Sequence, residues 1–119
     1  GMNTTQKESY ALAMGEEWAD GLDALPHHMH GGVVRYVLHG IEGGRFLSSV
    51  IKGDLFGAVR AADDMNIDAL PAYANFFHNY APSRCFGSAD VHNAWVALGG
   101  VAGLHAAHTK AMADLEEDE

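Results

Sequence analysis

Large apolar residues recur along most of the chain at intervals of three or four positions, the spacing of one face of a helix. The first such series is Tyr10, Met14, Trp18, Leu22 and Leu25. No stretch shows the alternation of period two that marks a half-buried strand, and no Asn-Gly or Asp-Gly pair joins two strand-like runs. The sequence therefore predicts an all-α protein.

Glycine, proline and capping residues divide this apolar pattern into short helices. Pro26 suits the first turn of a helix over residues 27–39, and Gly40 suits its left-handed C-terminal cap. The predicted N-caps of later helices are Asp54, Asn66 or Asp68, and Ser88. Because the helices are short and the turns tight, we expect a compact irregular bundle of about five to six short helices.

The chain divides into three predicted parts. Residues 25–115 are expected to form a single helical domain, because 119 residues leave little room for a second core. Residues 1–24 are expected to form an amphipathic arm, opened by Gly1, which is typical of a residue left by tag cleavage. The apolar stripe of this arm needs a surface, either the chain's own core or a second copy. We favour a homodimer contact, with the arm dispensable for the core fold. Residues 116–119 are acidic, lie at the negative end of the last helix dipole, and are expected to fray.

Charge and composition exclude several classes of partner. The 7 Lys and Arg against 16 Asp and Glu give 7 − 16 = −9, which repels phosphate backbones and anionic membrane surfaces. No apolar run approaches the roughly 20 residues of a membrane span, and no signal segment opens the chain. We therefore expect an acidic cytoplasmic protein that binds neither nucleic acid nor membranes. The single cysteine excludes an internal disulfide.

Several short motifs together resemble a family of small uncharacterised bacterial proteins that often occur in phage or prophage-like gene sets. The resemblance covers roughly residues 25–100. It rests on the run LPHHMHGGVVRY at 25–36, Gly40-Ile41, Phe46-Leu47, Asp54-Leu55, Asn79-Tyr80-Ala81-Pro82, Cys85, Gly87-Ser88 and Trp95. It implies a helical fold and a phage-related origin, and it implies no activity.

Histidine provides the main candidate for metal chemistry. His27, His28 and His30 cluster at a predicted helix start, among 8 histidines in the chain. A zinc or nickel site needs three or four such ligands converging at about 2.0 to 2.1 Å. The alternative, which we favour, is that these imidazoles cap helices or lie partly exposed, because His-Glu-x-x-His and Cys-x-x-Cys are both absent.

Other polar groups give weaker indications of function. Arg35 and Tyr36 lie within a predicted helix face, where they either form a partner site or pack their stems on the core, the more common case. Cys85 is interpreted as a small packing residue, and the hydrolase, P-loop and dinucleotide motifs are missing. We therefore expect no catalytic residue and no cofactor.

These observations favour a non-enzymatic, phage-related interaction or regulatory protein that binds another protein or itself. The candidate interaction residues are Arg35, Tyr36, Tyr10, Met14, Trp18 and Leu22. The alternative is a metal-binding protein or metal-dependent enzyme that uses His27, His28 and His30.

Overall fold

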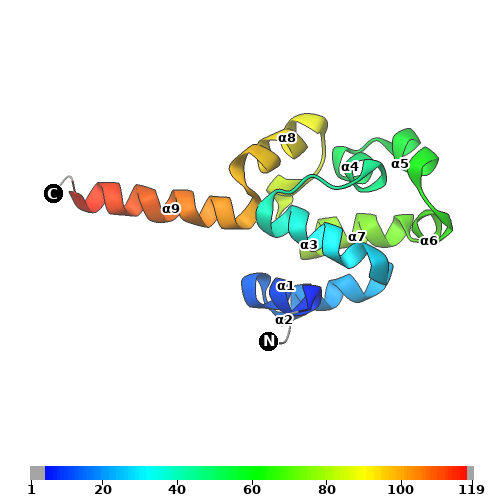
Figure 1. Cartoon of the computed structure of the whole chain (residues 1–119), viewed down its shortest axis with the longest axis horizontal. Helices are drawn as coiled ribbons and strands as arrows, with labels where there is room; N and C mark the ends of the chain where they lie inside the picture. The colour runs from blue at the N-terminus through cyan, green and yellow to red at the C-terminus, as the bar shows by residue number, and fades with distance from the viewer. Residues whose placement is uncertain (1–4, 118–119) are drawn as a thin grey trace.

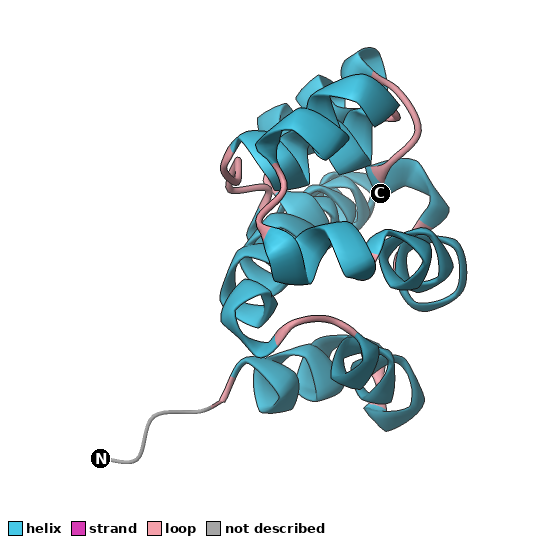
Figure 2. Cartoon of the chain, turned by 90° about the vertical axis from the view of Figure 1, so that its right-hand side faces the viewer, coloured by secondary structure: helices cyan, strands magenta, loops and turns pink. Residues whose placement is uncertain are grey.

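The computed structural model describes residues 5–117, and every regular element in that range is a helix (Figures 1 and 2). This confirms the predicted all-α class. Within residues 5–117, nine α-helices and three short 3-10 helices replace the predicted five to six: α1 (Gln6–Met14), α2 (Glu16–Asp20), η1 (Gly21–Ala24), η2 (His27–Met29), α3 (His30–His39), α4 (Arg45–Lys52), α5 (Leu55–Ala61), α6 (Asp64–Asp68), α7 (Leu70–Tyr80), η3 (Ser83–Cys85), α8 (Ala89–Leu98) and α9 (Gly100–Glu117).

The first predicted helix, over residues 10–25, is divided into three elements. Gly15 adopts a φ of 99°, a conformation that side-chain-bearing residues rarely adopt, and it separates α1 from α2. From Gly21 the chain tightens into η1. Gly15 and Gly21 therefore change the course of the backbone and divide the single predicted helix. This accounts for part of the larger number of helices.

Most helix ends follow the predicted capping chemistry. Gly40 closes α3 in the left-handed conformation with a φ of 65°, and Gly53 and Gly99 close α4 and α8 in the same way. The Asp54 side chain accepts the Gly57 N–H at 2.9 Å, and Ser88 accepts the Val91 N–H at 3.1 Å. The predictions for Gly40, Asp54 and Ser88 are confirmed.

The capping prediction for Asn66 and Asp68 is wrong. Asp63 caps α6 by accepting the Asn66 N–H at 2.7 Å, and α7 begins without a side-chain cap. The Asn66 side chain is buried, and its oxygen accepts the Tyr73 hydroxyl at 2.7 Å. The Tyr73 hydroxyl therefore binds the Asn66 amide oxygen, which the sequence pattern had assigned to a helix cap.

The helices stack in three tiers (Figure 1). α1 and α2 form the lowest tier, α3 and α7 cross the middle, and α4, α5 and α8 lie above. The core between the tiers is aromatic at its centre, with Tyr10, Tyr36, Tyr73, Phe76 and Trp95 almost fully buried.

The N-terminal segment belongs to this core. Tyr10 and Leu22 have no exposed surface, and the Tyr10 hydroxyl donates to the carbonyl oxygen of Tyr80. The Tyr10 ring also lies 5.9 Å from that of Phe76. The favoured prediction, that this stripe contacts a second copy, therefore differs from the structure, in which the chain's own core covers it. Residues 1–4 of the predicted arm lie outside the described part of the chain.

In contrast, α9 leaves the body and projects alone (Figure 1). Its first turn packs beside α3 and α8, whereas every residue from His105 to Glu117 is exposed. Glu116 and Glu117 are helical, and residues 118–119 are outside the described range, so the expected fraying of residues 116–119 stays a prediction. Within residues 5–117, no helix has both the length and the apolar character needed to cross a membrane.

Candidate functional site

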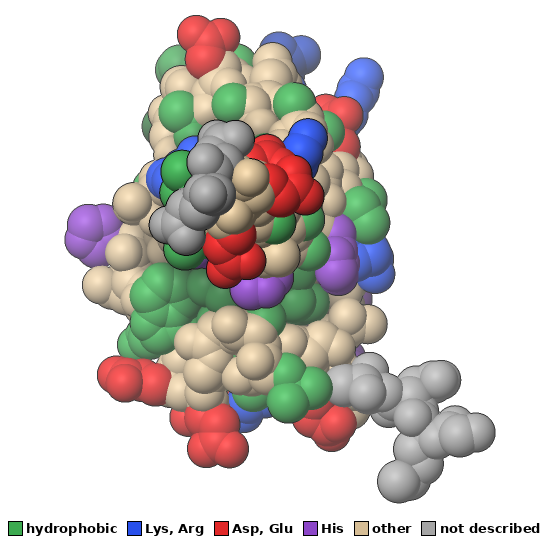
Figure 3. Space-filling model, turned by 90° about the vertical axis from the view of Figure 1, so that its left-hand side faces the viewer, with side chains coloured by type: hydrophobic (Ala, Val, Ile, Leu, Met, Phe, Trp, Pro, Cys, Tyr) green, Lys and Arg blue, Asp and Glu red, His purple; other side chains and the backbone are tan. Residues whose placement is uncertain are grey.

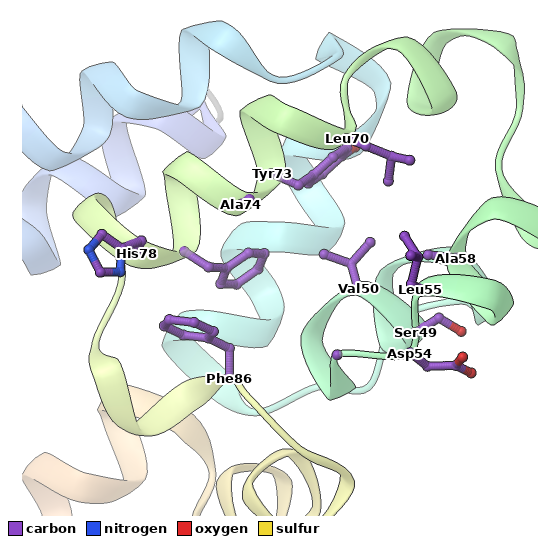
Figure 4. Close-up of a pocket in the computed structure, with 12 residues that line it drawn as sticks. Ser49, Val50, Asp54, Leu55, Ala58, Leu70, Tyr73, Ala74, His78 and Phe86 are labelled. Carbon is purple, nitrogen blue, oxygen red and sulfur yellow. The ribbon is translucent and has the colours of Figure 1, made fainter.

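An apolar groove of about 510 Å³ opens between α5 and α7 (Figure 4). Ala58 and Leu55 from α5 and Val50 from α4 line one wall. The opposite wall comes from α7 and from the loop after it: Leu70, Tyr73, Phe77 and Phe86. Polar atoms are confined to the ends, where Asp54 and Ser49 lie at one side and His78 at the other. The groove therefore presents hydrocarbon and aromatic surface along its length.

Three local features hold the two walls apart and in place. Gly57 lies against the ends of the Ser49 and Asp54 side chains, so that a β-carbon at this position would displace these side chains. The Gly87 N–H donates to the Ile51 carbonyl at 2.8 Å, which ties the loop bearing Phe86 to the end of α4. The Phe86 ring in turn lies 5.8 Å from the Phe77 ring.

Leu55, which lines the groove, begins a series of large exposed apolar side chains in α5 and α6. Leu55 is 63% exposed and Phe56 is 80% exposed, and Val59 and Met65 are also exposed nearby in sequence. Leu55, Phe56 and Val59 are the large apolar residues of α5. In the structure α5 instead buries its small residue Ala58, so the large side chains point away from the core. Soluble chains rarely cluster such residues outside a binding surface.

Arginines line two hollows beside the groove. Arg45 and Arg60 line the first, which shares Ser49 with the groove, and Arg35 and Arg45 line the second. Among residues 5–117, none of these three arginines is ion-paired, since the salt bridges there join Lys7 to Asp20 and Asp23, and His28 to Asp63. A chain with a net charge of −9 thus offers unpaired positive charge in a hollow that adjoins this apolar groove.

The three candidate metal ligands have separate partners. His28 Nε2 lies 3.0 Å from the Asp63 carboxylate, and His30 Nε2 donates to the Leu25 carbonyl at 3.0 Å. The rings of His27 and His30 approach each other with centroids 5.2 Å apart. Throughout residues 5–117, no group of three or more His, Cys, Asp or Glu side chains is arranged to hold a metal ion. The arrangement gives the metal-binding alternative no support, and metal binding stays an untested prediction.

The Asp63 carboxylate that contacts His28 also serves as the α6 cap. The Asn66 backbone N–H, together with His28, holds the pKa of this carboxyl below its usual range. His28 and Asp63 are both about half exposed to solvent. We interpret this pair as a link between η2 and α6, in keeping with the favoured reading of these imidazoles as local hydrogen-bonding groups.

The predicted interaction residues divide into exposed and buried groups. Arg35 is exposed and lines the second hollow, whereas Tyr36 is fully buried. Tyr10 and Leu22 are buried in the core, and Met14 and Trp18 pack against it. Of these six residues, Arg35 alone is exposed, and the hollow that it lines shares no lining residue with the groove. The sequence missed the groove itself, whose walls come from residues 49–58 and 70–86.

A buried polar cluster lies around Tyr36 and is distinct from the groove. The Tyr36 hydroxyl donates to the Cys85 carbonyl at 2.6 Å, and its ring stacks on His92 with centroids 5.4 Å apart. Trp95 Nε1 donates to the carbonyls of Tyr36 and Val37 at 3.1 and 3.2 Å. Burial raises the pKa of the Cys85 thiol to about 12, so the reactive thiolate is scarce at neutral pH. This cluster joins α3, η3 and α8 and has the chemistry of a structural core.

Comparison with protein-family models, with curated proteins and with solved structures found no match to this chain.

Proposed function

We propose that this protein is a non-enzymatic interaction protein whose groove between α5 and α7 binds an acidic amphipathic helix of a partner protein. The observation that carries the proposal is the exposure of Leu55 and Phe56 beside an apolar groove of about 510 Å³. In helix-in-groove recognition, a partner's amphipathic helix lays its apolar face into an apolar groove of this kind.

Charge complementarity selects the chemistry of the partner helix. Its apolar face would lie on Val50, Leu55 and Phe77, and its flanks would meet the unpaired arginines Arg45 and Arg60. Carboxylates match arginine in geometry and charge, and such pairs at an interface rim favour association and exclude wrong partners. A basic helix would meet like charge at the same place. The phage-related origin implied by the resemblance stays part of the proposal, with such a partner encoded in the same gene set.

Peptide binding tests the proposal. A labelled helical peptide with leucines at i, i+3, i+4 and i+7 and glutamates on its flanks should bind with micromolar affinity in fluorescence anisotropy. Leu55→Asp should weaken binding at least about tenfold, because a charge would replace an apolar anchor. Leu12→Asp is the matched control, because Leu12 is 86% exposed on α1, away from the groove, and should bind as the unaltered chain does.

A second comparison isolates the arginines. The same peptide with lysine in place of glutamate should bind more weakly, and Arg45→Glu with Arg60→Glu should reverse that preference. The groove assignment is overturned if the glutamate peptide does not bind, or if Leu55→Asp and Leu12→Asp bind it equally.

A further inference from the structure

The projecting helix α9 carries a stripe of apolar residues that extends beyond the part of the helix in contact with the body. The stripe comprises Val101, Leu104, His108, Met112 and Leu115, at steps of three, four, four and three residues. Val101 packs against the core, whereas Met112 is 48% exposed and Leu115 is 63% exposed. The side of the helix that packs on the core at Val101 is therefore exposed to solvent farther along, at Met112 and Leu115.

An uncovered helix of this kind is unfavourable in water. Most helical stability in proteins comes from packing of the apolar face, and short isolated helices are marginal. The 18-residue α9 has no side-chain N-cap and ends in acidic residues, which oppose its own dipole. A surface that covers Leu104, Met112 and Leu115 would supply the missing stabilisation.

The titratable side chains of α9 differ between its two halves. His105, His108 and Lys110 precede the acidic residues Asp114, Glu116 and Glu117, and of the first three only Lys110 counts as charged at pH 7. Acidic side chains gather around the projecting end in Figure 3. His105 and Glu116 flank the same side of the apolar stripe, but their separation of 11 positions, about 16 Å along the axis, prevents contact within one helix. In an antiparallel pair of such helices, the His105 imidazole of one copy would instead lie near the Glu116 carboxylate of the other and could donate a hydrogen bond to it.

We propose that α9 pairs with α9 of a second copy in an antiparallel arrangement. This orientation sets Leu104 against the partner's Leu115 and His105 against the partner's Glu116. A parallel pair would instead set the acidic ends side by side. The antiparallel pair is two-fold symmetric, so every contact occurs twice and the assembly closes as a dimer.

Further apolar residues lie near the start of α9 at Gly100, here called its base. In an antiparallel pair the C-terminal end of the partner's α9 lies close to them. Ile41, which is 51% exposed, follows Gly40, and the backbone of Gly40 touches that of Gly100 at the start of α9. Leu98 and Val101 are partly buried beside it. In the antiparallel arrangement the partner's Leu115 approaches this base. The pairing is independent of the proposed groove function and uses none of the groove residues.

The decisive measurement is the mass of the full chain in solution by sedimentation velocity at several concentrations. The unaltered chain should form a dimer, and Leu115→Asp should weaken it by about 100-fold or more, because the change removes two apolar contacts and adds two charges. Leu12→Asp, on the exposed face of α1, should dimerise as the unaltered chain does. Far-UV circular dichroism checks that each variant remains folded.

A charge exchange tests the orientation. His105→Glu should weaken the dimer about tenfold, because it sets two pairs of like charges across the interface. Adding Glu116→Lys to His105→Glu should restore the affinity, because each glutamate then faces a lysine of the partner. These two positions cannot contact each other within one chain, so restoration reports on pairing between chains.

Three results would overturn the proposal: a monomer at every concentration, a dimer that Leu115→Asp leaves intact, or a failure of the second substitution to restore the first. Leu55→Asp separates this proposal from the groove function. If α9 docked in the groove of another copy, Leu55→Asp would abolish assembly; in the antiparallel pair it abolishes peptide binding alone.

Discussion

The backbones of Gly40 and Gly100 touch where α3 ends and α9 begins. Both residues have a left-handed conformation, with φ of 65° and 67°. A β-carbon on Gly40 would lie 2.8 Å from the Gly100 nitrogen, and one on Gly100 would lie 2.5 Å from the Gly40 nitrogen. The direction in which α9 leaves the body therefore depends on two side-chain-free positions in contact.

We expect Gly100→Ala to lower the free energy of unfolding by about 2 to 4 kcal/mol. Left-handed strain and the collision with backbone that has no room to move both contribute. Urea unfolding followed by circular dichroism measures the change. Gly44→Ala is the control, because Gly44 has a φ of −70° and open space around it, and should change stability by less than about 0.5 kcal/mol. Equal stability of the two variants would contradict the close contact.

The buried Tyr36 hydroxyl gives a second prediction. Tyr36→Phe should cost about 1 to 3 kcal/mol, because it leaves the buried Cys85 carbonyl without its donor at 2.6 Å. Tyr80→Phe makes the same chemical change at a partly exposed position and should cost less. Chemical denaturation of both variants provides the comparison, and a neutral effect of Tyr36→Phe would show that this hydrogen bond adds no stability.

Alkaline pH should destabilise the fold through three buried tyrosines. Burial raises the pKa of Tyr10, Tyr36 and Tyr73 in the folded chain, whereas unfolded tyrosine ionises near pH 10. A raised folded pKa gives stability that is complete below about pH 10 and is lost as the pH rises towards the folded values. The Cys85 thiol, whose folded pKa burial raises to about 12, ionises near pH 8.5 in the unfolded chain and acts in the same direction. The urea midpoint should therefore begin to fall above about pH 8.5 and fall further by pH 11. A midpoint that is unchanged at pH 11 would contradict this.

The N-terminal segment should be necessary for folding. A chain that starts at Asp23 loses Tyr10 and Leu22, both fully buried, and should melt without cooperativity. As a milder test, Tyr10→Ala should cost about 3 to 5 kcal/mol, whereas Leu12→Ala, at an exposed position, should cost less than about 0.5 kcal/mol. A truncated chain that melts cooperatively would restore the earlier expectation of a dispensable arm.

Sequence reasoning succeeded where the signal is local. Gly40, Gly53 and Gly99 end helices, and Asp54 and Ser88 begin them, because each satisfies backbone groups within a few residues of itself. Such chemistry is complete before tertiary structure forms. The all-α class follows from the same short-range periodicity.

The failures arise where tertiary contacts decide. Asn66 looks like a cap, but it is recruited by Tyr73 seven residues away. The sequence of α5 shows that Leu55 and Phe56 are large and apolar, but it does not show which face of the helix is buried. In the structure Ala58 is buried, and both large side chains are exposed. The walls of the groove come from residues 49–58 and 70–86, and no local sequence pattern predicts that these two segments lie next to each other. Similarly, the apolar residues of the N-terminal segment and of α9 recur at the same helical spacing. Only the tertiary structure buries Tyr10 and Leu22 and leaves Met112 and Leu115 exposed.

The groove and α9 occupy opposite ends of a molecule 57 Å long (Figure 1). In a dimer joined through α9, the two grooves therefore face outward and lie far apart. One dimer would then be bivalent. It could bridge two partner molecules, and on a repetitive array of partners its second attachment would form at high effective concentration, so that avidity would compensate for modest affinity at each groove.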